Sequence, residues 1–217
     1  MRRQVAVIDY GMGNLHSVAK ALEHADPAVE VVVTADPVAI RAAERVVLPG
    51  VGAIRDCLGE MARLDLIGVI TEVATEKPFL GVCVGMQALL TESEENGGTA
   101  ALGLIPGRVR RFPENLRNSD SRQILKVPHM GWNQVEQLHP HPLWEGIAQQ
   151  SRFYFVHSYY VQPEIETDSA AVTTHGLRFT AAISNGNLFA VQFHPEKSQE
   201  VGLRLYQNFI RWDGSHP

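Results

Sequence analysis

The sequence predicts an α/β fold in which helices flank a central, mostly parallel sheet, and a region of antiparallel or mixed strands is added to that sheet. Two observations support this class. Up to about Gly103, apolar strand-like runs alternate with helical stripes, and strands joined through helices usually run parallel in a sheet covered on both faces. Beyond Gly103 the runs become short and alternate in polarity, with Pro, Gly, Asn and Asp between them, which is typical of antiparallel strands.

The first half of the chain is expected to contain strands separated by helices. The strand-like runs lie at 4–9, at 29–33, at 45–48 and directly before Cys83. A first helix is expected after Asn14 as its N-cap, because apolar residues then recur at helical spacing. A second helix is expected to bury Ile54 and Met61, and a third is expected to follow Asp65 as its cap.

The second half is expected to contain shorter strands and to end in a helix. The strand-like runs lie at 108–112, 129–138, 152–156, 170–174, 179–184 and 188–193. A polar loop is expected at 113–122, and the helix after Ser198 is expected to bury Val201, Leu205 and Phe209. Because we find no linker and no internal repeat, residues 1–217 are expected to form a single domain.

Cys83 stands in the pattern G-x-C-x-G, with Gly81 and Gly85 two positions away on either side. An apolar run precedes it and a helix-forming run follows, which is the arrangement of a nucleophile elbow with cysteine in place of serine. Such a turn is tight and strained, so it needs small residues near the nucleophile. At the start of the next helix, unpaired N–H groups and the helix dipole favour a thiolate. Cys83 is therefore the candidate nucleophile.

His194 and Glu196 are the candidate base and the acid that orients it. Phe189, Val191 and Phe193 share one face of the strand at 188–193, so His194 and Glu196 are expected to point from the opposite face of an extended chain. The proline between them ends sheet pairing, which places both at a strand end, where catalytic groups gather in α/β folds. The chain order Cys, His, Glu thus offers a nucleophile, a base and an orienting group.

The composition fits a globular enzyme with no nucleic-acid or membrane partner. The 217 residues (24.0 kDa) are 45% hydrophobic and 20% charged, which is ordinary for a globular chain. With a net charge of −5 and no Lys/Arg stripe, no nucleic-acid footprint is expected. No apolar run approaches the length of a membrane span, and no signal peptide is apparent. The histidines lack metal-ligand spacing, so neither a metal nor a cofactor is expected.

The two cysteines are expected to differ in role. Cys57 falls on the apolar face of the second helix and is expected to be a small core residue. A disulfide between Cys57 and Cys83 would block the candidate nucleophile, so a reducing cytoplasm is the expected location.

Two glycine pairs follow predicted strands without matching a nucleotide-binding motif. The run Gly11-Met12-Gly13 lacks the third glycine of a dinucleotide fingerprint, and Gly50-Val51-Gly52 lacks the Lys-Ser/Thr of a phosphate loop. The second run could present backbone N–H groups to a tetrahedral oxyanion beside the cysteine, or it could merely turn the chain. Spacing alone leaves both alternatives open.

The motifs at 81–87 and 193–196 resemble those of the triad, or class I, glutamine amidotransferases. Further blocks resemble one branch of that family, whose partner is a cyclase in histidine biosynthesis; they lie at 49–52, 103–107, 126–133, 155–159 and 194–198. The block at 128–133 discriminates best between branches. The resemblance covers nearly the whole chain and implies a flavodoxin-like scaffold.

The resemblance implies that Cys83 attacks the carboxamide of glutamine, that a γ-glutamyl thioester forms, and that ammonia passes to the cyclase, which makes imidazole glycerol phosphate and AICAR. It also implies residues around the substrate: Gly50, Gly52, Val84, Gln87, Glu95, His157, Ser158 and Tyr159. Two of these have other interpretations, since Glu95 lies in an acidic run that could be a solvated face and His157 could be structural.

A partner interface is implied by the same resemblance, because ammonia released to solvent is lost. Pro128, Met130, Trp132 and Lys197 are the candidate residues, and interfaces favour aromatic residues and Met. Lys197 resembles a family position that pairs with an acidic residue of the cyclase. The alternative is that the aromatic residues of this region fill the core; Trp132 is the one expected at the surface.

Two rival functions and one mode of control stay open. Another triad glutaminase, such as the pyridoxal-phosphate-synthase or anthranilate-synthase type, would share the three catalytic residues without the block at 128–133. A non-catalytic redox-sensing or binding protein on the same scaffold would need only Cys83. We also hypothesise that partner occupancy rotates a peptide around Gly50-Val51, which would make glutaminase activity conditional on the partner.

Overall fold

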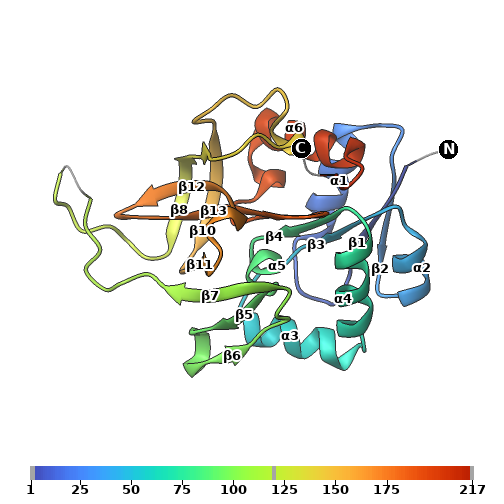
Figure 1. Cartoon of the computed structure of the whole chain (residues 1–217), viewed down its shortest axis with the longest axis horizontal. Coiled ribbons are helices and arrows are strands. Elements are labelled where there is room, and N and C mark those ends of the chain that lie inside the picture. Colours follow the sequence, from blue (N-terminus) through green and yellow to red (C-terminus); the bar gives the residue numbers. More distant parts are fainter. Residues whose placement is uncertain (1–2, 119–120, 216–217) are drawn as a thin grey trace.

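The computed structural model describes residues 3–118 and 121–215, whose strands form one large sheet and one small sheet (Figure 1). The strands are β1 (Gln4–Ile8), β2 (Glu30–Thr34), β3 (Arg45–Leu48), β4 (Phe79–Val82), β5 (Leu90–Ser93), β6 (Thr99–Ala100), β7 (Ile105–Arg111), β8 (His129–Gln134), β9 (Glu136–Gln137), β10 (Arg152–His157), β11 (Tyr159–Pro163), β12 (Ser169–His175), β13 (Leu177–Asn185) and β14 (Leu188–Val191).

The helices are α1 (Leu15–Ala25), α2 (Pro37–Ala42), α3 (Ile54–Arg63), α4 (Ile67–Glu76), α5 (Val84–Gln87) and α6 (Gln199–Arg211). Short 3-10 turns occur at Glu95–Gly97, Pro142–Trp144, Glu166–Asp168 and Pro195–Lys197. Within the described part of the chain, no helix is both long enough and apolar enough to cross a membrane.

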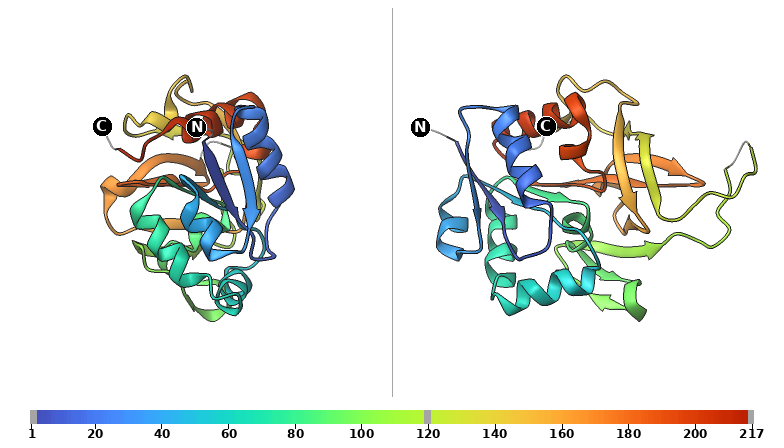
Figure 2. Two further views of the ribbon diagram at one scale, coloured as in Figure 1. Left: turned by 90° about the vertical axis from the view of Figure 1, so that its right-hand side faces the viewer. Right: turned by 180° about the vertical axis from the view of Figure 1, so that it is seen from behind.

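The parallel part of the large sheet has the neighbour order β2-β1-β3-β4-β14. This is the order of flavodoxin-like doubly wound folds, in which ligands bind beyond the carboxyl ends of the strands. The α1 and α6 helices cover one face, while α3 and α4 lie on the other (Figures 1 and 2). The predicted parallel sheet between helices is confirmed.

The added region begins at β13, which pairs antiparallel with β14, β12 and β11. The sheet continues through β7 and β5 to β6. The small sheet pairs β8 with β10 in antiparallel register, and the rings of Phe153 in β10 and Phe193 stack with centroids 4.0 Å apart. The prediction of added antiparallel and mixed strands is also confirmed.

Two predictions about helix starts need correction. Asp65 is not the cap of α4, because it has a positive φ of 55° and Leu66 occupies the N-cap position. Asn14 is at the N-cap of α1, but its side chain makes no capping hydrogen bond. The sequence reasoning also missed α2, although Asp36 accepts a hydrogen bond from the Val38 N–H and a proline follows at the first helical position.

The strand expected at 188–193 ends early, at Val191. The chain then enters a 3-10 turn at Pro195–Lys197, so the segment carrying His194 and Glu196 is not extended as predicted. The His194 and Glu196 side chains nevertheless meet, because the chain curls between them as it enters this turn.

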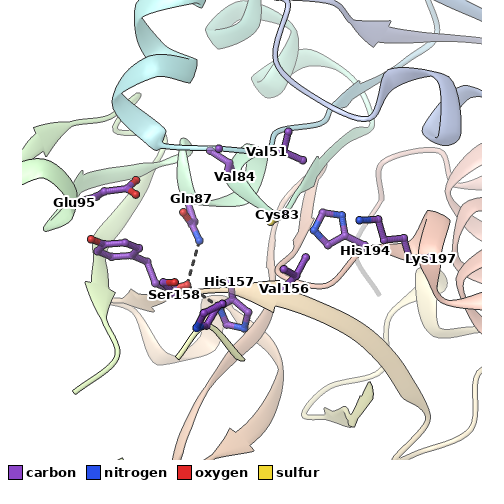
Figure 3. Close-up of a pocket in the computed structure, with 13 residues that line it drawn as sticks. Val51, Cys83, Val84, Gln87, Glu95, Val156, His157, Ser158, His194 and Lys197 are labelled. Carbon is purple, nitrogen blue, oxygen red and sulfur yellow. Dashed lines mark hydrogen bonds between the residues drawn. The ribbon is translucent and has the colours of Figure 1, made fainter. Parts of the chain in front are cut away.

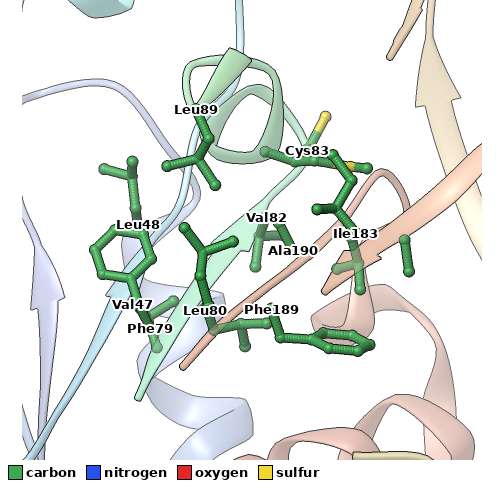
Figure 4. Close-up of a cluster of buried hydrophobic side chains, with 14 of the residues drawn as sticks. Val47, Leu48, Phe79, Leu80, Val82, Cys83, Leu89, Ile183, Phe189 and Ala190 are labelled. Carbon is green, nitrogen blue, oxygen red and sulfur yellow. The ribbon is translucent and has the colours of Figure 1, made fainter. Parts of the chain in front are cut away.

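A dense hydrophobic cluster lies under Cys83 (Figure 4). Val47 and Leu80, from the neighbouring strands β3 and β4, and Phe189 from β14 are fully buried in it. Gly85 is required at the top of the cluster, because a Cβ atom there would overlap the carbonyl oxygen of Leu48. The strand ends are therefore packed closely enough to hold the cysteine in a fixed position.

Candidate active site

Cys83 occupies a sharp turn between β4 and α5. Its backbone has φ 55° and ψ −110°, a conformation of the kind that costs a non-glycine residue about 1–3 kcal/mol. The turn is held by backbone hydrogen bonds, including one of 2.8 Å from the Cys83 N–H to the Val191 carbonyl. This is the geometry of a nucleophile elbow. Because α5 is a single turn of four residues, it lacks the dipole of a long helix, on which the sequence argument relied.

His194 and Glu196 form a buried pair beside the elbow. The His194 Nδ1 and Glu196 Oε1 atoms are 2.8 Å apart, and the two side chains are 3% and 1% exposed. A carboxylate only accepts hydrogen bonds, so Nδ1 carries a proton and donates a hydrogen bond to Glu196. The imidazole lies next to Cys83 (Figure 3), and its Nε2 atom makes no hydrogen bond to a described residue.

The pKa of His194 is raised above its ordinary value. Burial is the largest single influence and lowers the pKa, but the interactions of the ring with Cys83 and Glu196, by charge and by hydrogen bonding, together outweigh burial. A raised pKa favours the imidazolium form, and an imidazolium next to a sulfur favours the thiolate. The pair is therefore arranged for nucleophilic attack by sulfur.

A cavity of about 430 Å³ opens at Cys83 and His194 (Figure 3). Seven of the residues predicted around the substrate line it, and these are Gly52, Val84, Gln87, Glu95, His157, Ser158 and Tyr159. Val51, Pro128, Val156 and Lys197 complete the lining. Gly50 and Glu196 do not line the cavity; they contact residues that do.

The segment at 49–52, which follows β3, lies directly against the elbow. The Gly50 carbonyl accepts a hydrogen bond of 3.4 Å from the N–H of Val84, the residue after the nucleophile, and at a nucleophile elbow this N–H usually donates to the oxyanion. Gly50 must be glycine here, since a Cβ atom would lie 2.8 Å from the Gly85 nitrogen. An oxyanion could use the Val84 N–H only after the Gly50 carbonyl has turned away.

Two buried side chains hold the carbonyls on either side of Gly50. The Tyr10 hydroxyl donates to the Pro49 carbonyl at 2.6 Å, and the Cys57 thiol donates to the Val51 carbonyl at 3.4 Å. Cys57 is fully buried, as predicted, and burial raises its pKa to about 11, so it remains a neutral donor. The Gly50–Val51 peptide therefore lies between two peptides whose carbonyls, those of Pro49 and Val51, are held by hydrogen bonds.

Gln87 is oriented by partners on the wall of the cavity. Its Nε2 atom donates to the Tyr159 carbonyl at 3.2 Å and to Gln192 Oε1 at 3.0 Å. The first of these hydrogen bonds is drawn in Figure 3. Glu95 lies further along the same wall, where its Oε2 atom accepts a hydrogen bond of 2.8 Å from the Ile54 N–H at the start of α3.

His157 lines the cavity with both ring nitrogens already in hydrogen bonds. Nδ1 is 2.7 Å from the Tyr159 carbonyl, which only accepts, and Nε2 is 3.0 Å from His129 Nδ1. Asn133 Nδ2 lies 3.2 Å from His129 Nε2 and fixes the other end of the pair. Burial lowers the pKa of His157 to about 4 and that of His129 to about 3, so both rings are neutral. His157 can therefore touch a substrate only through its carbon atoms or backbone.

The outer face of the small sheet is exposed next to the cavity. Met130 is 62% and Trp132 is 38% exposed, and Trp132 pairs with Tyr154 across the strands. The Lys197 Nζ atom lies 6.0 Å from the centroid of the Tyr154 ring. Trp132 is at the surface as predicted, whereas Phe153 and its neighbours on the inner face of β10 belong to the core.

Sequence reasoning missed two polar groups at this site, Tyr10 and Gln192. Gln192 is fully buried, and its Nε2 atom lies 3.7 Å from Cys83 Sγ. One signal was present, because alternation in the run that precedes Pro195 puts Gln192 on the same face as His194. No local signal marks Tyr10, whose partner is thirty-nine positions away.

Comparison with known proteins agrees with this geometry. The model of the family "Glutamine amidotransferase class-I" matches residues 6–212. Among solved structures, a protein described as a glutamine amidotransferase has a TM-score of 0.68 at 18% identity, covering 95% of this chain and 97% of its own. A putative GMP synthase protein from Thermoplasma acidophilum has a TM-score of 0.66 at 20% identity, covering 97% and 94%. These two structures support the fold. The chain belongs to the class I glutamine amidotransferase family.

Curated relatives narrow the assignment within that family. The chain is 60% identical to the imidazole glycerol phosphate synthase subunit HisH of Methylococcus capsulatus, with 96% of each chain covered. It is 56% identical to subunit HisH 1 of Pseudomonas aeruginosa, with 99% of each covered. Within the class I family, its group is therefore that of the HisH amidotransferase subunits.

Proposed function

We propose that the chain hydrolyses glutamine to glutamate and ammonia, with Cys83 as nucleophile, His194 as base and Glu196 as the group that orients His194. The observation that supports this most is their convergence. A strained cysteine and a buried imidazole–carboxylate pair, from segments far apart in the chain, meet at one cavity. That combination is what acyl transfer by a thiol requires.

The reaction follows from these roles. The Cys83 thiolate attacks the carboxamide carbon of glutamine, and the imidazolium of His194 gives its proton to the departing nitrogen, which leaves as ammonia. Water then attacks the γ-glutamyl thioester, with His194 accepting a proton, and glutamate is released. Glu196 keeps Nδ1 protonated throughout, so that Nε2 remains the atom that exchanges protons with the reactants.

We further propose that the Gly50–Val51 peptide rotates before the oxyanion can be stabilised. The Gly50 carbonyl now accepts from the Val84 N–H, so rotation would free this donor and turn the Val51 N–H toward the site. One oxyanion donor is worth about 10²–10³ in rate. Control of this single peptide by a partner would therefore make the glutaminase conditional.

A cyclase subunit is the proposed partner, completing imidazole glycerol phosphate synthase as a heterodimer. The HisH relatives are named as subunits of that enzyme, and the exposed face around Met130 and Trp132 lies beside the cavity that would release ammonia. Lys197 lines the cavity and reaches this face, so it is suited to contact an acidic residue of the cyclase. Residues 1–217 would act as one amidotransferase domain in the cytoplasm, where the unpaired Cys57 and Cys83 stay reduced.

The decisive experiment measures glutamate release by the purified chain with and without the cyclase and its ligand. Cys83→Ser and His194→Gln should abolish the stimulated rate, whereas His16→Gln, at an exposed histidine of α1, should not. Met130→Ala should weaken co-purification with the cyclase more than Val38→Ala, which removes a 72% exposed side chain from α2. Glutamate release by Cys83→Ser at the wild-type rate would refute the proposed mechanism.

A further inference from the structure

Gln192 is a fully buried amide beside the nucleophile, and the mechanism above gives it no role. It lies in the turn after β14, two residues before His194. Its Nε2 atom is 3.7 Å from Cys83 Sγ, and its Oε1 atom accepts a hydrogen bond of 3.0 Å from Gln87 Nε2. Both ends of the amide are therefore engaged, one of them by the reacting sulfur.

The direction of this amide is imposed by its neighbours. The Tyr159 carbonyl can only accept, so the group of Gln87 that faces it at 3.2 Å must be the nitrogen. The same nitrogen also donates to Gln192, which must accept this hydrogen bond with its oxygen. The nitrogen of Gln192 is then the atom turned to Cys83, so the sulfur receives an N–H group.

An N–H group aimed at sulfur distinguishes between the two ionisation states of the thiol. A thiolate is a strong acceptor and a neutral thiol a weak one, so the hydrogen bond favours the charged form. The amide carries no titratable proton, unlike His194, so its contribution persists when the imidazole has given its proton to the leaving nitrogen.

We propose that Gln192 stabilises the Cys83 thiolate by donating this N–H, and that Gln87 holds Gln192 in the required direction. The inference rests on the proposed function, in which the thiolate is the attacking group. The same donor acts twice in that reaction. It stabilises the thiolate before attack on glutamine, and again when the carbon–sulfur bond of the thioester breaks and the sulfur departs with its electron pair.

The test follows the ionisation of the sulfur without any turnover of glutamine. The rate of Cys83 alkylation by iodoacetamide is measured against pH, with the Cys83 peptide followed by mass spectrometry. Gln192→Met and Gln192→Leu each remove the amide at similar size without placing a charge beside the sulfur. Each variant should move the midpoint of the profile upward by about one pH unit.

A matched control separates this effect from general loss of stability. Asn208→Leu removes another buried amide, which donates to the Leu143 and Glu145 carbonyls far along the chain from the elbow. It should lower the thermal stability without moving the alkylation midpoint. The second Gln192 variant serves if the first does not fold.

An unchanged midpoint in a folded Gln192 variant would overturn the inference, whatever its stability. The outcome is also distinct from failure of the proposed function. If the wild-type chain and its cyclase release no glutamate while the midpoint still shifts, the glutaminase proposal fails and the role of Gln192 in ionising the sulfur stands. If glutamate is released and the midpoint does not shift, the glutaminase proposal stands and the proposed role of Gln192 fails.

Discussion

Replacing Tyr10 by phenylalanine removes one hydroxyl and tests whether its hydrogen bond holds the segment at 49–52 in place beside the elbow. The hydroxyl donates to the Pro49 carbonyl at 2.6 Å, and both residues are buried. Without it the carbonyl loses its partner in a place that water does not reach. An unsatisfied buried group of this kind costs about 1–3 kcal/mol. In a chain of this size, that corresponds to a fall in Tm of roughly 2–12 °C.

The effect on activity should exceed the effect on folding. Tyr10 does not line the cavity, so the KM for glutamine should change little. The anchor of the peptide before Gly50 is lost, however, and the rotated Val51 N–H would be placed less accurately. We expect the partner-stimulated kcat to fall about tenfold, short of the 10²–10³ for complete loss of one oxyanion donor.

The assay combines thermal unfolding with stimulated and unstimulated glutaminase rates. Tyr160→Phe is the matched control, because the Tyr160 ring packs on Phe112 and Phe179, on a different part of the sheet. A merely structural role would lower both rates by the same factor and leave their ratio unchanged. That result, obtained together with the expected fall in Tm, would refute the anchoring argument.

Three further predictions concern the elbow, the buried histidines and the triad. Gly85→Ala should lower the free energy of unfolding by about 1–3 kcal/mol or more in urea titrations, because its Cβ atom overlaps the Leu48 carbonyl. Because the pKa of His157 is lowered to about 4, the unfolded chain binds a proton at this residue more readily than the folded chain does. The free energy of unfolding should therefore fall from pH 6.5 toward pH 4, with His157 contributing up to about 3 kcal/mol of the loss. His157→Gln should make this slope less steep. Glu196→Gln should lower kcat by about 10²–10⁴ with little change in KM, because an amide can present a donor to the Nδ1–H of His194 and favours the wrong tautomer.

Two of these three predictions have an internal comparison. Gly59→Ala adds a methyl group to α3 in open space and should raise the free energy of unfolding by about 0.5–1 kcal/mol, because alanine favours a helix interior over glycine. His24→Gln, at an exposed histidine of α1, should leave the pH slope of stability intact. Three results would contradict these expectations: Gly85→Ala unfolding like wild type, a slope in His157→Gln as steep as in wild type, or a wild-type kcat in Glu196→Gln; a smaller slope from the buried His129 should remain in His157→Gln.

The parallel half of the fold could be predicted because its signals are local. The run 45–48 is entirely apolar apart from Arg45 and became β3 with the same bounds, and the glycines around Cys83 marked the elbow. The short helix α2 was not predicted, because its six residues are too few for apolar residues to recur at helical spacing. Asp65 was misassigned because aspartate suits both a helix cap and a turn of positive φ, and the sequence does not choose between them.

Within the site, the identity of the residues could be predicted better than their contacts. The spacing of His194 and Glu196 indicated a pair, but the turn that joins them depends on how the chain leaves β14. His157 was assigned to the substrate, yet whether its nitrogens are free depends on His129, which reaches it across the small sheet. The role of Tyr10 likewise depends on a carbonyl brought to it only by folding. Long-range contacts of this kind leave no periodic trace in a single sequence.

The pairing of β4 with β14 has a consequence for how such proteins diversify. Val82 and Val191 are register partners at the ends of adjacent parallel strands; the nucleophile Cys83 directly follows Val82, and the base His194 comes three positions after Val191. The distance between the reacting atoms is thus set by two neighbouring strands, although more than a hundred residues of chain separate the two side chains. Evolution, or an engineer, could therefore vary the exposed face around Met130 and Trp132 to fit another ammonia acceptor without disturbing the reacting pair.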